Sequence, residues 1–407
     1  MKIAIIGSGP AGLAAAVAAS QAGAKVTVLE RMPELSIKLR ASGGGKCNFS
    51  NTLEPLPFME KFGRDGRFMQ DALRNCSNEF LIGFLAKMGV PAVAEDGFHY
   101  FPVSGRAGDI AQAFYREAAA HGAVFLTDRT VEKISPGFML ELSSGETFKA
   151  DKVILACGGK AFPSLGGTGK GLDLAQSLGH TVTETFPALA PVLIREEWIQ
   201  EHSGISLKDA AIQFGKGRNK RCGHGELLFT HKGFSGPCAL DLSGEIAESS
   251  GENGLEILFR PCYSHTPDFW RNELERMRKE GKTKLVKTWL AQYFPHSLAE
   301  RFSKMTDSDE TRCCELKSQT RDQLIRFLGE GIPLTATGAG PMSCAMAMRG
   351  GVKLQEVNPK TMESRIIPGI YFAGEILNLN GPCGGYHIRW AFSAGFLAGK
   401  SAAQSDF

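Results

Sequence analysis

The chain has 407 residues, of which 43% are hydrophobic and 22% charged, and its formal net charge is +3. This length exceeds what one ordinary core supports, so we expect two or three domains. The near-neutral charge argues against a nucleic-acid or membrane partner held by bulk electrostatics, and no apolar run approaches the roughly 18 residues of a membrane span. Ten cysteines without any C-x-x-C spacing argue against a disulfide scaffold or zinc ribbon and favour a cytoplasmic, bacterial-type protein with reduced thiols.

The first thirty residues predict a strand, a helix and a second strand. Residues 2–6 form an isoleucine-rich run typical of a buried parallel strand. GSGPAG follows at once as a G-x-G-x-x-G motif, and residues 11–22 are rich in helix formers, with Gly23 placed to end the helix. Residues 24–29 are a second apolar strand that ends at Glu30. This is the βαβ dinucleotide-binding fingerprint in its required context.

Each part of this fingerprint has a physical role. Gly7 permits the tight turn, Gly9 lets a pyrophosphate approach the backbone, and Gly12 lets helix and strand pack closely. The free amides and the positive dipole end of the helix favour phosphate charge. Glu30 can accept hydrogen bonds from the adenosine ribose, and an acid there disfavours a 2′-phosphate. We therefore expect FAD or NAD rather than NADP.

The stretch LRASGGGKCNFSN, residues 39–51, is a costly loop because glycine loses more backbone freedom on folding than any other residue. Three consecutive glycines, residues 43–45, therefore indicate that something approaches the backbone closely; the alternative is a flexible surface loop. Cys47 could be a redox thiol, but no second cysteine lies nearby in sequence, so a packing role is favoured.

Several short strands are expected further along. Residues 138–142 and 147–149 flank the turn SSGE as a hairpin, and the apolar run VILACGG follows. PGIYFAGEI predicts another strand, which ends at Gly374 and Glu375. A helix with an apolar face begins after the two glycines at 384–385.

The middle of the chain, from about 190 to 350, contains no second fingerprint. TGAGP imitates one, but Ser343 stands where its third glycine should be, so we interpret TGAGP as a loop. AAIQF, GELLFT and ALDLS are expected to be short strands of a small β-barrel, and residues 266–330 contain amphipathic helical stretches. The basic run KGRNKR, residues 216–221, is expected to be a solvated hairpin tip; the alternative is a contact to nucleic acid or an anionic substrate.

The sequence resembles the bacterial BaiN-like family of NAD(P)/FAD-dependent oxidoreductases. The matching segments, spread from residue 7 to 395, are GSGPAGLAAA, SGGGKCNFSN, FPVSGRAGDI, ACGGKAFPSLGGTGKG, GELLFTHKGFSGP, GGVKLQEVNPKTMESRIIPGIYFAGEILNLNG and GGYHIRWAFSAG. The resemblance implies an α/β, Rossmann-like FAD-binding fold of the two-dinucleotide-binding-domain flavoprotein type, with an inserted β-barrel plus helical domain. Residues 1–190 and 351–407 would form the FAD-binding domain, and residues 191–350 the insert, with a helical subdomain at about 266–330.

The resemblance also implies tightly bound, non-covalent FAD, with the glycine-rich loop running toward the isoalloxazine ring and Asn48 orienting a ring or substrate atom. Lys46 stands where family members typically carry Arg, which keeps the charge but loses the bidentate fork. The helix after Gly385 would face the flavin N1/C2 carbonyl and shift its potential by some tens of millivolts at most, from roughly 0.3–2 kcal/mol of helix-end electrostatics. The residues expected at FAD are Gly7, Ser8, Gly9, Pro10, Ala11, Gly12, Glu30, Arg31, Lys38, Gly43, Gly44, Gly45, Lys46, Cys47, Asn48, Val131, Ala156, Cys157, Gly158, Gly374, Glu375, Gly384, Gly385, Tyr386, His387 and Ile388.

The leading functional hypothesis is an FAD-dependent oxidoreductase that moves a hydride through flavin N5. Without a separate NAD(P)H-binding domain, either a substrate reduces the flavin directly or NAD(P)H docks transiently. The favoured reaction is NAD(P)H-dependent reduction of an enone-type or related small organic substrate. Tyr386 and His387 are the first candidates for catalysis because they begin the final helix, followed by His231 and His99. The alternatives are an oxidase of a small amine such as aminoacetone, a tRNA-modifying flavoprotein, or a flavin sensor without turnover. No metal, membrane or nucleic-acid partner is expected.

Overall fold

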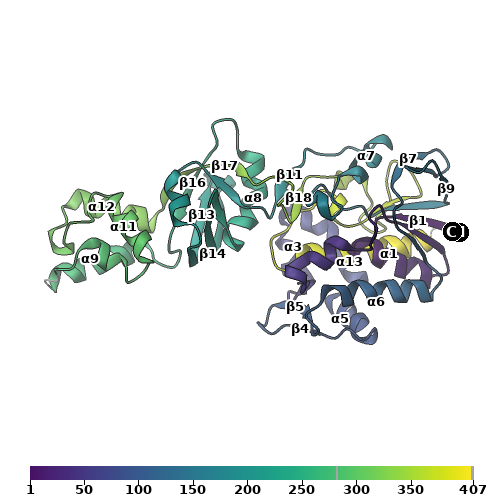
Figure 1. Cartoon of the computed structure of the whole chain (residues 1–407), viewed down its shortest axis with the longest axis horizontal. Coiled ribbons are helices and arrows are strands. Elements are labelled where there is room, and N and C mark those ends of the chain that lie inside the picture. Colours follow the sequence, from purple (N-terminus) through teal and green to yellow (C-terminus); the bar gives the residue numbers. More distant parts are fainter. Residues whose placement is uncertain (281–282, 405–407) are drawn as a thin grey trace. The chain divides into compact units, whose positions relative to one another are not determined.

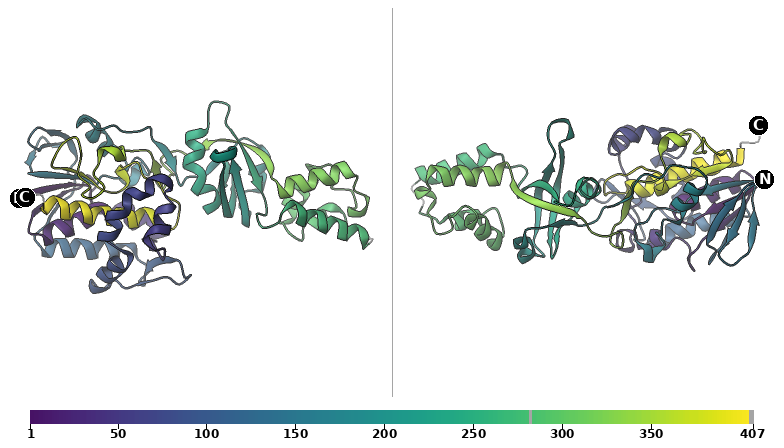
Figure 2. Two further views of the ribbon diagram at one scale, coloured as in Figure 1. Left: turned by 180° about the vertical axis from the view of Figure 1, so that it is seen from behind. Right: turned by 90° about the horizontal axis from the view of Figure 1, so that it is seen from above.

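The computed structural model describes residues 1–280 and 283–404 (Figure 1 and Figure 2). The chain divides into two compact units, the first made of Met1–Pro187 and Met342–Phe407 and the second of Ala188–Pro341. The first unit resumes at Met342 rather than at the expected residue 351, because β18 (Ala347–Arg349) belongs to it.

A five-stranded parallel sheet lies at the centre of the first unit. Its strand order is β19-β10-β1-β2-β6, so strands from both ends of the chain meet in one sheet. All of β10 and all but the first residue of β1 are buried, which explains their unbroken apolar sequences. The strands are β1 (Lys2–Ile6), β2 (Lys25–Leu29), β6 (Val124–Leu126), β10 (Lys152–Leu155) and β19 (Ile370–Phe372).

Two helices from opposite ends of the chain, α1 (Pro10–Gln21) and α13 (Tyr386–Gln404), lie side by side in the first unit (Figure 1). Glycines on α13 make this close approach possible. A Cβ on Gly395 would lie 2.2 Å from the Ala11 carbonyl oxygen, and one on Gly399 would lie 2.3 Å from the Ala15 carbonyl oxygen. The contact therefore fastens the C-terminal segment onto the dinucleotide fingerprint.

The predicted hairpin is confirmed as β8 and β9 of a three-stranded antiparallel sheet, in which Leu140 lies opposite Phe148. A second small sheet has the order β3-β5-β4. The remaining elements of the first unit are α2 (Ile37–Ala41), β3 (Ser50–Asn51), α3 (Pro55–Glu60), α4 (Gln70–Asn75), α5 (Asn78–Lys87), β4 (Ala92–Val93), β5 (His99–Pro102), α6 (Ala107–Ala120), β7 (Val131–Ser135), β8 (Met139–Leu142), β9 (Thr147–Lys149), α7 (Lys170–Ser177) and β11 (Phe186–Ala188).

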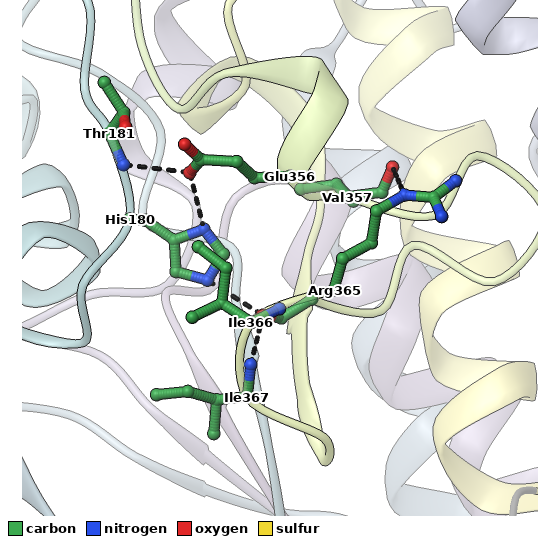
Figure 3. Close-up of polar contacts among 8 residues, drawn as sticks. His180, Thr181, Glu356, Val357, Arg365, Ile366 and Ile367 are labelled. Atoms are coloured by element: carbon green, nitrogen blue, oxygen red, sulfur yellow. Dashed lines mark hydrogen bonds and ion pairs between the residues drawn. The ribbon is translucent and has the colours of Figure 1, made fainter.

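A polar cluster around the buried ring of His180 holds the segment that precedes β19 (Figure 3). His180 is only 3% exposed; its Nδ1 lies 3.2 Å from a Glu356 carboxylate oxygen and its Nε2 lies 2.9 Å from Ser364 Oγ. The Thr181 amide donates to the same Glu356 oxygen, and Ser364 Oγ accepts from the two backbone amides at 366 and 367. The cluster joins three separate segments, so we interpret it as a structural clamp.

The second unit contains a closed barrel with the strand order β12-β15-β14-β13-β16-β17. KGRNKR lies at the exposed turn of the β13-β14 hairpin, as expected. TGAGP, interpreted above as a loop, is instead strand as far as Ala339 and pairs with β12. The strands are β12 (Val192–Ile194), β13 (Ser206–Phe214), β14 (Arg221–Thr230), β15 (Gly233–Ser235), β16 (Leu255–Arg260) and β17 (Ile332–Ala339).

ALDLS, expected to be a strand, lies in helix α8 (Pro237–Ser249), so this prediction was wrong. Pro237 starts the helix, and Cys238, Leu242 and Ile246 are buried at helical spacing. The predicted amphipathic helices are present, with α11 in addition, and their apolar faces share one core with the barrel. These helices are α9 (Pro267–Lys279), α10 (Val286–Leu290), α11 (His296–Lys304) and α12 (Ser318–Gly329).

Candidate active site

The three glycines of the G-x-G-x-x-G motif are needed for different reasons. Gly7 has φ +102°, and a Cβ on it would lie 2.6 Å from the Ala156 carbonyl oxygen. A Cβ on Gly12 would lie 1.9 Å from the Gly7 carbonyl oxygen, so the helix packs directly on the turn. A Cβ on Gly9 would meet no described residue within 4 Å. The space over Gly9 is therefore open at the N-terminus of α1, where backbone amides favour a phosphate.

Glu30 lies beside this loop at the end of β2. One of its carboxylate oxygens accepts hydrogen bonds from the Ser8 amide (2.8 Å) and the Ser8 hydroxyl (2.6 Å). The other accepts from the Met32 amide at 2.9 Å. A carboxylate has about four acceptor positions, so one remains for a ribose hydroxyl. Arg31, which follows Glu30, has an Nε that is buried and without a partner among the described residues.

The carboxylate of a second acid, Glu375, lies close to residues of three more segments. Its Oε2 lies 3.0 Å from Lys38 Nζ on α2, and its Oε1 accepts from the Met348 amide at 2.9 Å. Gly158, after β10, is close enough that a Cβ on it would lie 3.7 Å from the same carboxylate. Glu375 follows β19 and Glu30 follows β2, so the expected residues meet at the carboxyl ends of the parallel strands, the usual ligand-binding edge of such sheets.

The GGG loop has a backbone that other residues rarely adopt. Gly43, Gly44 and Gly45 have φ of +56°, +64° and +88°, which is the left-handed region. Conformation alone therefore requires glycine here, in addition to any close approach. Cys47 is fully buried and its amide donates to the Ser42 carbonyl at 3.0 Å. Burial raises the pKa of Cys47 to about 12, which favours the packing role over a redox thiol.

The glycine pair before α13 lies against the end of this loop. A Cβ on Gly385 would lie 2.6 Å from the Ser50 carbonyl oxygen and 2.8 Å from Asn48 Oδ1. Asn51 donates from Nδ2 to the Gly384 carbonyl at 2.8 Å. Asn48 Oδ1 is buried and has no hydrogen-bond donor within residues 1–280 and 283–404. An orphaned acceptor beside bare backbone fits a bound group that supplies a donor, as the edge of a flavin ring does.

The two residues predicted to be catalytic occupy different surroundings. Tyr386 is 3% exposed, and its ring packs against Phe58 at a centroid distance of 5.0 Å. His387 Nε2 lies 2.8 Å from the Gly381 carbonyl oxygen. Neither contact tests a role in proton transfer, so both assignments stay predictions.

The structure places His99, a lower-ranked catalytic candidate, beside the glycine pair at 384–385. Its Nε2 is 3.2 Å from where a Cβ on Gly384 would stand, and its Nδ1 is 2.6 Å from an Asp96 carboxylate oxygen. Hydrogen bonds from His99 and from the amides of His99 and Phe98 hold the pKa of Asp96 well below its usual range. A carboxylate that orients one ring nitrogen leaves the other directed toward Gly384. His231 belongs to the second unit, in the turn between β14 and β15.

Sequence reasoning missed Arg389, one turn into α13. This side chain is 1% exposed and donates from Nη1 to the Leu53 carbonyl at 2.9 Å. The guanidinium carbon lies 4.4 Å from the centroid of the Phe58 ring. Only its position within the first turns of the helix after Gly385 could have signalled it, because arginine is normally exposed.

The fold and the site define a Rossmann-type FAD-binding flavoprotein. The model of the family described as HI0933-like protein Rossmann domain matches residues 1–401. The chain belongs to this HI0933-like, BaiN-like family of FAD-dependent oxidoreductases, and it is an enzyme of that family. Family membership implies a flavin cofactor.

Two relatives align with this chain over nearly their full lengths. The chain is 32% identical to a 3-dehydro-bile acid delta(4,6)-reductase of Clostridium scindens, covering 99% of each chain. It is 28% identical to a ribosomal RNA dihydrouridine synthase of Haemophilus influenzae, covering 98% of each. Among solved structures, a 3-ketosteroid dehydrogenase from Rhodococcus jostii shares the fold at 16% identity, with a TM-score of 0.51 over 99% of this chain and 96% of the other.

Within the described residues, every helix is too short or too polar to cross a bilayer.

Proposed function

We propose that the protein is a flavin-dependent reductase that adds a hydride to a carbon–carbon double bond conjugated with a carbonyl group, with NAD(P)H as the transient electron donor. FAD would be bound tightly and without a covalent bond. When bound, it supplies hydride transfer at N5. The observation that supports the proposal is that one unit of a chain of this family holds both the open backbone at Gly9 beside Glu30 and the unpaired acceptor of Asn48 beside Gly385.

The names of the relatives support the reaction class. A delta(4,6)-reductase of a 3-oxo steroid saturates double bonds conjugated with a ketone. Formation of dihydrouridine saturates the C5–C6 bond of uracil, which is conjugated with the C4 carbonyl. The two substrates differ greatly in size, but the electrophile is the same. This shared chemistry favours reduction of a conjugated carbonyl compound over oxidation of an amine.

Residues of this chain would bind and orient the reactants. The amides at the start of α1 would hold the pyrophosphate, and Glu30 would hold the ribose. Asn48 and the backbone at Gly384 and Gly385 would contact the ring edge. Saturating the double bond also requires a proton, and His99, Tyr386 and His387 are the candidates to deliver it.

An anaerobic reduction screen tests the proposal. The yellow protein is mixed with NADH or NADPH and then with 3-oxo-4-ene steroids, simple enones or small amines. We expect bleaching by a nicotinamide and recovery of colour only with a conjugated carbonyl compound, whose saturated product is identified by mass spectrometry. Bleaching only by an amine, with peroxide formed in air, would instead support the oxidase. A protein bleached by no donor would support the sensor.

An RNA substrate is the second candidate, and one observation favours it. The β13-β14 hairpin presents Lys216, Arg218, Lys220 and Arg221 as exposed side chains, although Arg221 is paired with Glu245. Such a basic tip can contact phosphates. If RNA is the substrate, the reduced enzyme forms dihydrouridine in unmodified ribosomal RNA, and the rate falls steeply with salt. Replacing the four basic residues with glutamine would then reduce the rate on RNA and leave reduction by NAD(P)H unchanged.

A further inference from the structure

Arg389 is a buried cation that forms no ion pair with any residue of the described part of the chain. Its Nε and Nη2 have no hydrogen-bond partner among the residues that the structure describes, and only Nη1 is satisfied, by the Leu53 carbonyl. Phe58 covers one face of the guanidinium. An uncompensated buried charge is strongly destabilising, commonly by several kcal/mol.

Cys76 and Glu54, two of the groups that interact electrostatically with Arg389, do not neutralise it within the core. Burial lowers the pKa of Arg389 to about 10, so the side chain still carries its charge at neutral pH. The groups that oppose this lowering are Cys76, Glu54 and Tyr386. Burial raises the pKa of Cys76 itself to about 12, which leaves that thiol neutral, and Glu54 is exposed on the surface. Because the described residues supply no buried counter-ion, we expect a bound group to supply the compensating negative charge.

A chain of hydrogen bonds connects Arg389 to the glycine pair at the start of its own helix. Arg389 holds the Leu53 carbonyl, and the Leu53 amide donates to Asn51 Oδ1 at 3.2 Å. Asn51 in turn donates to the Gly384 carbonyl. The Arg389 amide donates to the Gly385 carbonyl at 3.1 Å, which closes the circuit. The side chain thus fixes the backbone that lies against Asn48.

We propose that Arg389 is a positioning residue that holds the Gly384–Gly385 backbone against the flavin and provides a fixed positive charge favouring the negative charge of the reduced cofactor. Its Nε and Nη2 are buried and have no hydrogen-bond partner among the described residues. They act through the field of the guanidinium, which adds to the positive end of α13. This inference rests on the proposed flavin site. It names Arg389 as a residue that sets the redox potential of the flavin bound there.

The test is the midpoint potential of the bound flavin in two variants of the holoenzyme. Arg389→Gln keeps an amide donor for the Leu53 carbonyl but removes the charge. We expect it to weaken binding of reduced relative to oxidised flavin by about tenfold, which lowers the potential by about 30 mV. Arg389→Lys keeps the charge and should change that ratio less than threefold.

Arg301→Gln is the matched control. Arg301 also stacks on an aromatic ring, with its guanidinium carbon 5.3 Å from the centroid of Trp198, and its Nε is unpaired among the described residues, but it lies in the second unit. The control should keep the wild-type potential. Equal potentials in Arg389→Gln and Arg301→Gln, or equal lowering in Arg389→Gln and Arg389→Lys, would overturn the assignment. A wild-type protein that binds no flavin would instead refute the proposed function.

Discussion

Gly9 and Gly12 belong to one G-x-G-x-x-G motif, yet a methyl group at each would meet very different surroundings. Gly9 is open and has an ordinary φ of −63°, so Gly9→Ala should leave the apo-protein as stable as wild type or more stable by about 0.4–1 kcal/mol. The methyl group would occupy the phosphate space, and FAD affinity should fall at least about tenfold, or 1.4 kcal/mol. Flavin titration followed by fluorescence and urea unfolding of the apo-protein measure the two effects.

Gly12→Ala is the matched comparison, because its methyl group would lie 1.9 Å from the Gly7 carbonyl oxygen. This variant should lose stability by several kcal/mol, as overpacked sites do, and lose FAD together with the fold. Wild-type FAD affinity in Gly9→Ala would show that the pyrophosphate does not lie over Gly9.

The cysteines provide a second residue-scale prediction. Burial raises the pKa values of Cys47 and Cys157 to about 12, whereas Cys222 and Cys344 are exposed. Iodoacetamide at pH 8 should therefore label Cys344 within minutes and reach Cys47 only after unfolding, as peptide mass spectrometry would show. Partial burial also raises the pKa of Cys222, so its labelling should be slower than that of Cys344. Cys47→Ala should retain reduction of the flavin by NAD(P)H within about twofold. Loss of reduction in a folded Cys47→Ala protein would restore the redox role.

Individual residues show what the sequence could and could not reveal about the site. The fingerprint glycines and Glu30 could be predicted from the sequence because spacing alone fixes their positions relative to a strand and a helix. The contact between Asn48 and Gly385 and the burial of Arg389 depend on how residues more than 300 positions apart pack together. Hydrophobic periodicity carries no signal for such contacts, so His99 and Arg389 could not be ranked from sequence.

At the scale of elements, the clamp formed by His180 predicts a pH effect on stability. Burial lowers the pKa of His180 below its ordinary value of 6.5, although Glu356 opposes this, so the folded chain holds the ring neutral. As the pH falls below 6.5, His180 of the unfolded chain binds a proton while His180 of the folded chain stays neutral. The free energy of unfolding that this group contributes above pH 6.5 is therefore lost as the pH falls toward the lowered pKa of the folded state. Burial would raise the pKa of Glu356, but hydrogen bonds from Thr181 and His180 keep it below its ordinary 4.5, so acid continues the loss.

His180→Leu removes the titrating group. At pH 7.5 it should cost about 1–3 kcal/mol of unfolding free energy, because Glu356 and Ser364 lose a buried partner. The fall in stability between pH 6.5 and 5 should also become shallower, as measured by urea unfolding across the pH range. His121→Leu is the control, since that ring lies exposed at the end of α6. An unchanged pH slope in His180→Leu would remove the clamp as its cause.

The elements predicted wrongly share one cause. ALDLS contains a short apolar alternation that fits a strand, but Pro237 and the burial of Ile246 make it the first half of a helix. TGAGP has the composition of a loop, yet its first residues complete the barrel by pairing with β12. In both places tertiary packing overrides local propensity, whereas α1 was identified correctly from its helix-forming residues and α9 from its periodic apolar residues.

The whole chain enters the second unit once and returns once, and the two crossing points are neighbours. Val192 on β12 pairs with Ala339 on β17, and the Gly340 amide donates to the Pro191 carbonyl at 2.7 Å. Each unit also has its own hydrophobic core. The insert therefore closes on itself at the point where it joins the rest of the chain, which is the arrangement that tolerates excision.

We therefore predict that the two units fold separately. A chain in which a short Gly-Ser linker joins residue 187 to residue 342 should bind FAD within about tenfold of the intact affinity, because Gly9, Glu30, Asn48 and Gly385 all belong to the first unit. Residues 188–341 alone should unfold cooperatively in urea without binding flavin. If the joined chain is folded by circular dichroism but stays colourless with added FAD, while the intact chain is yellow, residues of the insert must hold the cofactor. The strand ends of the first unit would then be insufficient for binding.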